Sequence, residues 1–215
     1  MGYFKLPPST EINRSIPKNA FDKFTNAKQK KLLVEAVDKI KWTNKIAPET
    51  INLTGTEITE IQVFEIQLKT KNNVREILDV IDKSIPYHIV FILHFQQNIL
   101  ISTTKKHPHI TKEDLAVLDW NFSTEWLDMS SATIQFILQS SIDTVYANLC
   151  FQIKGCDDKK ITIQDFIEKD AAIKNISYQI EKLKSAIKNC KQFNRRVELN
   201  LQLNSKVTEL NGLQH

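Results

Sequence analysis

The sequence predicts an α+β fold, in which a mixed, mostly antiparallel sheet is flanked by helices and a long, coiled-coil-like helical arm follows. Strict alternation of apolar and polar residues over Glu60–Lys69 is typical of a half-buried strand. The run His88–Phe95 is apolar on both faces, which predicts a central strand. The segment 162–213 contains no proline and only one glycine, Gly212. We therefore predict a core domain at 1–160 and an arm at 161–215.

The N-terminal elements are predicted in chain order. The proline-rich stretch Lys5–Pro17 is expected to be a loop or a short helix docked on the core. An apolar stripe over Asn26–Ile40 predicts a helix, and Lys41–Ile46 is expected to form a short strand before Pro48. Within Glu60–Lys69, Phe64, Ile66 and Leu68 should be buried, while Glu65, Gln67 and Lys69 should face solvent.

The later part of the core alternates between helix and strand signals. A helical apolar spacing ends before Pro86, and a tight connection after Phe95 indicates a hairpin. Thr111 with Asp114 resembles a capping box, which predicts a short helix there. The predicted elements are a helix at Asn73–Ser84, a strand at Asn98–Thr104, a helix at Thr111–Leu115, a strand at Asp119–Leu127 and a helix at Ile142–Ile153.

The arm carries an apolar seam with a spacing of three and four residues. Thr162 and Asp165 predict its capping box. Beyond Cys190 the apolar residues continue on a shifted face, so the arm is either one helix of about 75 Å or two helices folded back on each other. No glycine or proline marks a turn between Lys191 and Arg196, which favours pairing with a second copy in a homodimer. The seam residues are Ile173, Ile176, Ile180, Leu183, Ile187 and Cys190.

Composition restricts the class of protein. Hydrophobic residues make up 41% of the 215 residues and the net charge is +4, which permits a nucleic-acid partner without requiring one. We find no membrane-spanning stretch and no signal-peptide pattern, so we expect a cytoplasmic protein. Three cysteines without metal-ligand spacing are expected to be reduced thiols, and the histidines show no metal-ligand spacing either.

Five segments resemble a bacterial family, the domain-of-unknown-function family number 4391. These segments are IPKNAF (16–21), PETINL (48–53), IQVFEIQLK (61–69), IDKSIPYHIVFIL (81–93) and QFNRRVELN (192–200). The resemblance spans the chain from about Pro8 to Leu210. It implies a single-domain bacterial protein encoded near helicases and DNA methyltransferases of restriction or phage-defence loci. It implies no particular reaction.

One candidate active site combines Pro48-Glu49 with the polar face of the strand that ends at Lys69. Metal-dependent nucleases with a PD-(D/E)xK motif place an acid after a proline, and an acid and a lysine on the next strand. Glu49 and Glu65 would hold Mg²⁺, while Lys69 would stabilise charge on the phosphate. Gln67, however, stands where that motif has an acid, and its neutral oxygen is a weaker ligand. The alternative is that Glu65, Gln67 and Lys69 form an ordinary solvated strand face.

A second candidate site is a basic stripe on the arm. Six basic residues and no acidic residue lie between Lys182 and Arg196. On a continuous helix, a spacing of three and four residues would place several of them on one face, where they could meet successive phosphates. The alternative is an ordinary solvated helix face beside the seam. The predicted nucleic-acid-binding residues are Lys184, Lys188, Lys191, Arg195 and Arg196.

These patterns leave three hypotheses about function. The first is an accessory binding protein of a restriction or phage-defence locus, which binds DNA, a partner protein such as the helicase or methyltransferase of the same locus, or both. The second is a Mg²⁺-dependent nuclease of PD-(D/E)xK type or its inactive descendant. The third is a purely structural dimer. The hypothesis of a binding protein requires no cofactor, whereas the nuclease requires Mg²⁺.

Overall fold

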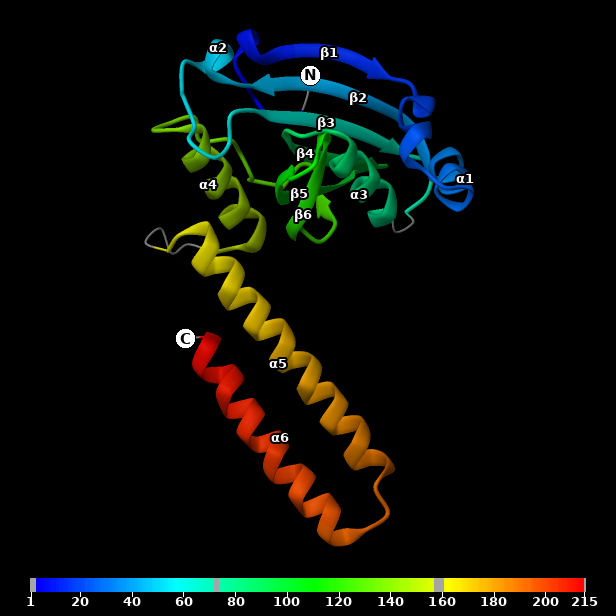
Figure 1. The fold of residues 1–215 in the computed structure, drawn as a ribbon, viewed down its shortest axis with the longest axis vertical. Coiled ribbons are helices and arrows are strands. Elements are labelled where there is room, and N and C mark those ends of the chain that lie inside the picture. Colours follow the sequence, from blue (N-terminus) through cyan, green and yellow to red (C-terminus); the bar gives the residue numbers. More distant parts are fainter. Residues whose placement is uncertain (1–2, 72–73, 157–160, 215) are drawn as a thin grey trace. The chain divides into compact units, whose positions relative to one another are not determined.

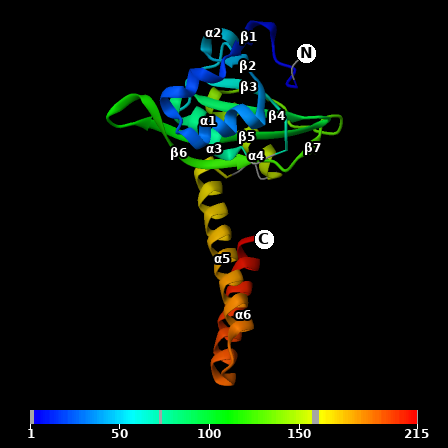
Figure 2. The ribbon, with the colours of Figure 1, turned by 90° about the vertical axis from the view of Figure 1, so that its right-hand side faces the viewer.

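A computed structural model describes residues 3–71, 74–156 and 161–214. The chain forms two compact units that divide at residues 157–158. The first unit is an α+β core and the second is a pair of helices (Figures 1 and 2). The described residues of the core form one seven-stranded sheet, whose main path runs in the order β1-β2-β3-β4-β5-β6, with β7 paired to β5. The fold class predicted from the sequence is confirmed.

All neighbouring strands in the sheet are antiparallel except β3 and β4. The parallel pair is joined by helix α3, as a parallel connection requires a crossover. The strands are β1 (Glu11–Ile16), β2 (Val37–Ile46), β3 (Ile61–Leu68), β4 (His88–Phe95), β5 (Asn98–His109), β6 (Lys112–Ser123) and β7 (Leu127–Asp128). The core helices are α1 (Ala27–Ala36), α2 (Pro48–Ile51), α3 (Arg75–Ser84) and α4 (Ile142–Lys154), and the 3₁₀ turns are Pro8–Thr10 and Lys18–Phe24.

Helices cover both faces of the sheet. Successive strand residues point to opposite faces, and Thr103 and Thr104 show this directly. The Thr103 hydroxyl donates to Oη of Tyr146 on α4, whereas the Thr104 hydroxyl donates to Asp82 on α3. Apolar side chains of α1 and α3 pack with Phe64, Ile66 and Leu68 in one hydrophobic core on the α3 face. The predicted strand faces are confirmed, because these three side chains are buried, Glu65 is half-buried, and Gln67 and Lys69 are exposed.

Two predicted N-terminal elements differ from the structure. The helix predicted at Asn26–Ile40 ends at Ala36, and Val37–Ile40 opens strand β2. The stripe was misleading because Val37 and Ile40 are buried by strand pairing with β3 and not by the helix. The stretch predicted as a loop contains strand β1, which pairs with β2 at the edge of the sheet. A bulge between Glu11 and Arg14 obscures the alternation of that strand.

The helix predicted at Thr111–Leu115 is wrong. Strands β5 and β6 form a long hairpin across this region, and His109 pairs with Lys112 next to its turn. Cross-strand pairing therefore outweighs the local capping signal of Thr111. The helix predicted at Asn73–Ser84 is α3, although Asn73 itself lies outside the described residues. Helix α4 confirms the helix at Ile142–Ile153, and it ends at Gly155, whose left-handed φ of 63° suits glycine.

The second unit is a helical hairpin. Helices α5 (Ile163–Asn189) and α6 (Phe193–Gln214) lie side by side and antiparallel, joined by the short link 190–192 (Figure 1). Thr162 and Asp165 form the predicted capping box of α5. Ile176 and Ile180 of the predicted seam are buried, together with Leu199 of α6. Of the two arrangements left open for the arm, the structure has two helices folded back, and the turn needs neither glycine nor proline.

Candidate functional sites

Part of the predicted strand site lies in a groove on the α4 face of the sheet. Glu65 lines a cavity of about 920 Å³ together with its cross-strand neighbour Lys41 and the N-terminal residues Tyr3 and Phe4. The backbone N–H of Tyr3 donates to Oε1 of Glu65 over 3.3 Å. Thus Glu65 is a half-buried carboxylate in a concave site, and the alternative of an ordinary solvated face does not describe it.

Glu65 also faces a histidine that the sequence pattern did not connect to it. Nε2 of His94 on β4 lies 3.7 Å from Oε2 of Glu65, and both side chains are about four-fifths buried. Within the described part of the chain, this nitrogen has no hydrogen-bond partner. Burial lowers the pKa of His94, while the Glu65 charge opposes the shift. Gln67 lies beside His94 on the neighbouring strand and donates to its backbone carbonyl over 3.3 Å.

The structure does not bring the other two predicted catalytic residues to this groove. Glu49 lies on α2, next to the start of β3, where it forms an ion pair with Lys45 at 2.6 Å. Lys69 follows the opposite end of β3, and its Nζ donates to the backbone carbonyl of Val34 over 2.9 Å. Eight strand residues separate the two positions by about 25 Å. Antiparallel pairing of β2 with β3 therefore separates Glu49 from Lys69.

A Mg²⁺ site of the nuclease type requires carboxylate oxygens as ligands. Across residues 3–71, 74–156 and 161–214, no group of three or more His, Cys, Asp or Glu side chains is arranged to hold a metal ion. Glu65 has Gln67 and His94 as near neighbours, not a second carboxylate. These residues do not fit the carboxylate-rich site that a nuclease uses, so we derive no step through Mg²⁺.

The predicted nucleic-acid-binding residues gather at the turn of the helical hairpin, which we call the basic tip (Lys184, Lys188, Lys191, Arg195 and Arg196). Lys184 and Lys188 lie near the end of α5, Lys191 lies in the link, and the arginines lie in the first turn of α6. They therefore do not form a stripe on one continuous helix, as the spacing had suggested. The turn instead concentrates their charges at one end of the hairpin.

Not all residues of the basic tip are equally available to a ligand. Lys184 pairs with Glu181 at 2.8 Å, and Arg195 pairs with Glu198 at 2.7 Å. Lys188, Lys191 and Arg196 have no ion-pair partner among the residues that the structure describes. Phe193 is 67% exposed at the same turn. The tip thus presents unpaired cations beside an exposed aromatic ring.

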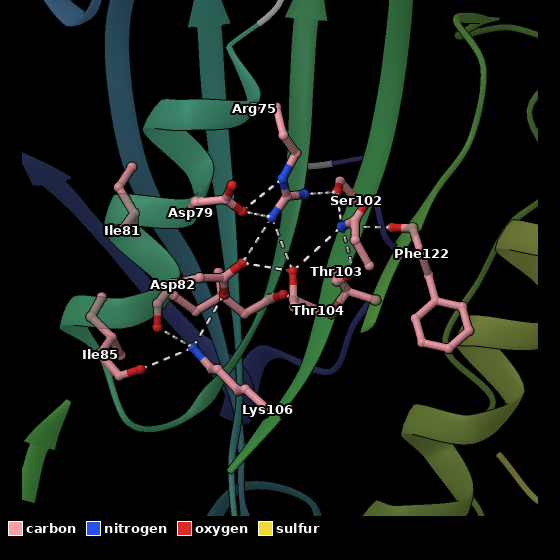
Figure 3. Close-up of polar contacts among 12 residues, drawn as sticks. Arg75, Asp79, Ile81, Asp82, Ile85, Ser102, Thr103, Thr104, Lys106 and Phe122 are labelled. Carbon is pink, nitrogen blue, oxygen red and sulfur yellow. Dashed lines mark hydrogen bonds and ion pairs between the residues drawn. The ribbon is translucent and has the colours of Figure 1, made fainter. Parts of the chain in front are cut away.

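A buried charged network links α3 to β5 on the other face of the sheet (Figure 3). Asp82 and Lys106 have fully buried side chains, with Nζ of Lys106 3.2 Å from Oδ1 of Asp82. The same ammonium donates to the backbone carbonyls of Asp82 and Ile85 over 2.7 and 2.9 Å. Burial raises the pKa of Asp82 and lowers that of Lys106, because desolvation disfavours each charge, while their mutual attraction opposes both shifts.

Arg75 extends this network towards solvent. Its guanidinium contacts Asp79 one helical turn on, and lies 3.6 Å from Asp82. It also donates to the hydroxyls of Ser102 and Thr104, each over 3.1 Å. Since every charge in the network is matched by a partner, its geometry favours attachment of α3 to the sheet over reaction chemistry.

The sequence contains a signal for this network in the spacing of its polar residues, which apolar periodicity alone does not reveal. Residues 75, 79 and 82 share a helix face at steps of four and three, and residues 102, 104 and 106 share a strand face. Polar side chains that share one face of a helix and one face of a strand, at those spacings, indicate a polar contact between the two elements. The pair Glu65 and His94 had no such signal, because it depends on which strands become neighbours.

Comparison with known proteins identifies the family of this chain and nothing further. No curated protein matches the chain significantly, and neither does any solved structure. No helix in the described part of the chain has the length and apolarity needed to cross a membrane. The sequence profile of one family, described as a domain of unknown function (DUF4391), matches residues 4–210, which is nearly the whole chain. The chain therefore belongs to the DUF4391 family, as the five resembling segments predicted.

Proposed function

We propose that this protein is a bacterial accessory binding protein that binds DNA through the basic tip of its helical hairpin. The observation that carries the proposal is the convergence of five basic residues at one turn, with no acidic residue between Lys182 and Arg196. Each phosphate contact releases counterions from the nucleic acid, so such a cluster binds it without a catalytic step. The exposed ring of Phe193 can stack on an unpaired base.

The cellular role that we propose is in a restriction or phage-defence locus, in the cytoplasm. The family resemblance supports this role, since its members are expected beside helicases and DNA methyltransferases. A protein partner from the same locus would use the exposed apolar row of α6, formed by Phe193, Val197 and Leu201. These side chains recur every four residues and lie on one helix face.

A titration of salt dependence tests DNA binding. We expect that changing Lys188, Lys191 and Arg196 to glutamine lowers the affinity for double-stranded DNA and reduces the slope of log affinity against log salt by about 3. The matched control changes Lys169, Lys174 and Lys206 to glutamine, which removes the same charge elsewhere on the hairpin. Equal losses in both variants would show a general charge effect, and an unchanged slope in the tip variant would reject the proposal.

A Mg²⁺-dependent nuclease of PD-(D/E)xK type, or its inactive descendant, is the second candidate. The order β2-β3-α3-β4, with β3 parallel to β4, supports this candidate, and the poor fit of Glu65 and its neighbours to Mg²⁺ favours the inactive descendant. Incubation of DNA with the full chain and Mg²⁺ tests this candidate. Cleavage that is lost in Glu65→Gln but kept in the basic-tip variant would favour an active nuclease over the binding protein.

A further inference from the structure

A second cavity, which we call the His107 cavity, lies in the core unit at the start of β4. Its volume is about 350 Å³, at the low end of the ~300–1,000 Å³ range of small-molecule sites. Its walls are the loop before β3, the residues Pro86–His88 and the hairpin β5–β6. Tyr87, His88, Lys105, His107 and Asp119 are among the residues that line it.

One wall is fixed by a carboxylate of α4. The side chain of Asp143 accepts hydrogen bonds from the backbone N–H groups of Thr56, Glu57 and Ile58, over 2.6, 3.1 and 2.8 Å. Three such bonds hold the loop in a single position against the start of the helix. The cavity is therefore framed by anchored backbone on this side.

A β-bulge places an acid beside a histidine at the mouth of the cavity. In the hairpin, Lys105 pairs with Trp120 and Lys106 pairs with Leu118, so Asp119 is an additional residue on β6. Bulges redirect side chains, and here the carboxylate of Asp119 lies 2.9 Å from Nδ1 of His107. A carboxylate at Nδ1 fixes the orientation of the ring and leaves Nε2 for a ligand.

Cations and carboxylates both line the cavity, with Lys105 and Lys106 on one side of the balance and Glu57, Glu60 and Asp119 on the other. His88 is only 8% exposed, and its Nε2 has no hydrogen-bond partner among the residues that the structure describes. Burial, together with the charges of Lys106 and Lys105, lowers the pKa of His88 to about 3, so this ring is neutral near pH 7. The ammonium of Lys105, which helps to disfavour a proton on His88, also attracts an anion.

Among the charged groups on the walls, Lys105 is the cation with the weakest ion-pair contact. Lys106 is occupied by Asp82, as Figure 3 shows, and Glu60 is held by Lys45 at 3.2 Å. Asp119 is paired with His107. The side chain of Lys105 is only 19% exposed, and its ion pair with Glu57 is long, at 3.9 Å, to a carboxylate that is itself 76% exposed. A ligand oxyanion can displace that contact at low cost.

We propose that the His107 cavity binds a phosphate monoester of mononucleotide size, with Lys105 and His107 on the phosphate. Tyr87, 42% exposed at the rim, offers a ring face on which a base can stack. This site lies in the core unit, so it is independent of DNA binding by the basic tip.

Calorimetric titration of the full chain tests the site with three probes. These are inorganic phosphate, adenosine monophosphate and a short single-stranded oligonucleotide with a terminal phosphate. We expect Lys105→Gln to weaken binding about tenfold or more, and His107→Gln to weaken it by a similar factor, since each removes a charge-assisted or oriented contact. Lys105→Arg should keep much of the affinity. Tighter binding of the mononucleotide than of the oligonucleotide identifies the free nucleotide as the source of the phosphate, and the reverse order identifies a nucleic-acid end.

Two controls separate this site from folding effects and from the basic tip. Lys83→Gln removes an exposed lysine of the same unit that does not line the cavity. The affinity of this variant for the mononucleotide should equal that of the wild type. The basic-tip variant should bind the mononucleotide as the wild type does. The proposal is overturned if the wild type binds none of the probes at millimolar concentration, or if Lys105→Gln and His107→Gln, with unchanged thermal unfolding, bind as tightly as the wild type.

Discussion

The two units of this chain bury their apolar residues very differently. The core encloses large side chains such as Phe64, Phe91 and Phe122 at 2% exposure or less, because helices cover both faces of a sheet. In the described part of the hairpin, only Ile176, Ile180 and Leu199 are buried, at 5–7% exposure. Two helices share one seam, and their remaining faces meet solvent. The core therefore supplies its own stability, whereas the hairpin retains surface for a partner.

The two units also differ in whether their ion pairs are buried or exposed. In the core, Asp82 and Lys106 are fully buried and paired with each other. On the hairpin, the ion pairs join exposed side chains, such as Lys184 with Glu181. A buried pair loses several kcal/mol when one partner is removed, while an exposed pair contributes about 0–1 kcal/mol. Removing one partner of an ion pair thus destabilises the core strongly and the hairpin very little.

The largest expected effect comes from breaking the buried pair. Lys106→Ala leaves the Asp82 carboxylate buried without its nearest cation, so we expect a loss of about 3–5 kcal/mol in the free energy of unfolding. The matched exposed change, Lys184→Ala on the hairpin, should cost about 1 kcal/mol or less. Urea unfolding is followed by tryptophan fluorescence for the core, since Trp42, Trp120 and Trp126 all lie in that unit, and by helical circular dichroism for the hairpin. Equal effects of the two substitutions would contradict the contrast.

A pair of leucine truncations compares apolar burial in the two units. Leu68 is 4% exposed in the core, and Leu68→Ala should cost about 2–5 kcal/mol through lost burial and the cavity left behind. Leu201 is 66% exposed on α6, and Leu201→Ala should change unfolding by about 0.5 kcal/mol or less. Urea midpoints by circular dichroism measure both. A large loss in the second variant would show that another surface already covers α6.

The core should also respond to acid through His88. Its pKa is about 3 in the folded chain and about 6.5 when unfolded, so between these values the unfolded state binds a proton that the folded state does not. The free energy of unfolding should therefore fall by up to about 1.4 kcal/mol per pH unit as pH drops from 6.5 towards 3. His88→Gln should flatten this slope by that amount in urea titrations between pH 6 and pH 4. An identical slope in wild type and variant would mean that His88 is not a buried neutral ring.

The smallest effect on the core is expected from disrupting the hairpin. Ile180→Asp with Ile187→Asp places charges in the seam between α5 and α6, which should reduce helical circular dichroism. The tryptophan-monitored core transition should move by about 0.5 kcal/mol or less. We expect sedimentation to show a dimer for the wild type and a monomer for the double variant, since a dimer formed by the arm requires the folded hairpin. A wild type that is monomeric at micromolar concentration would rule out the dimer, while the folded-back hairpin would stand.

Predictions from periodicity succeeded where a single helix or strand kept the same buried face along its whole length. Strand β3, helix α4 and the capping box at Thr162 agree with the structure, because each pattern reflects local backbone geometry. The prediction for Thr111–Leu115 failed because a long hairpin pairs those residues across strands. Glu49 and Lys69 were grouped by motif spacing, which says nothing about which end of a strand each residue occupies.

By itself, the sequence determined the α+β class, the faces of β3, the helical arm and the family. These follow from side-chain period and from motif order, which the chain carries locally. Only the tertiary structure decided which distant residues meet. Glu65 faces His94, and Lys106 faces Asp82, because strand order and register place them side by side. His107 meets Asp119 because one additional residue bulges from β6, and the cations of the arm gather at one end because its helix turns back at 190–192.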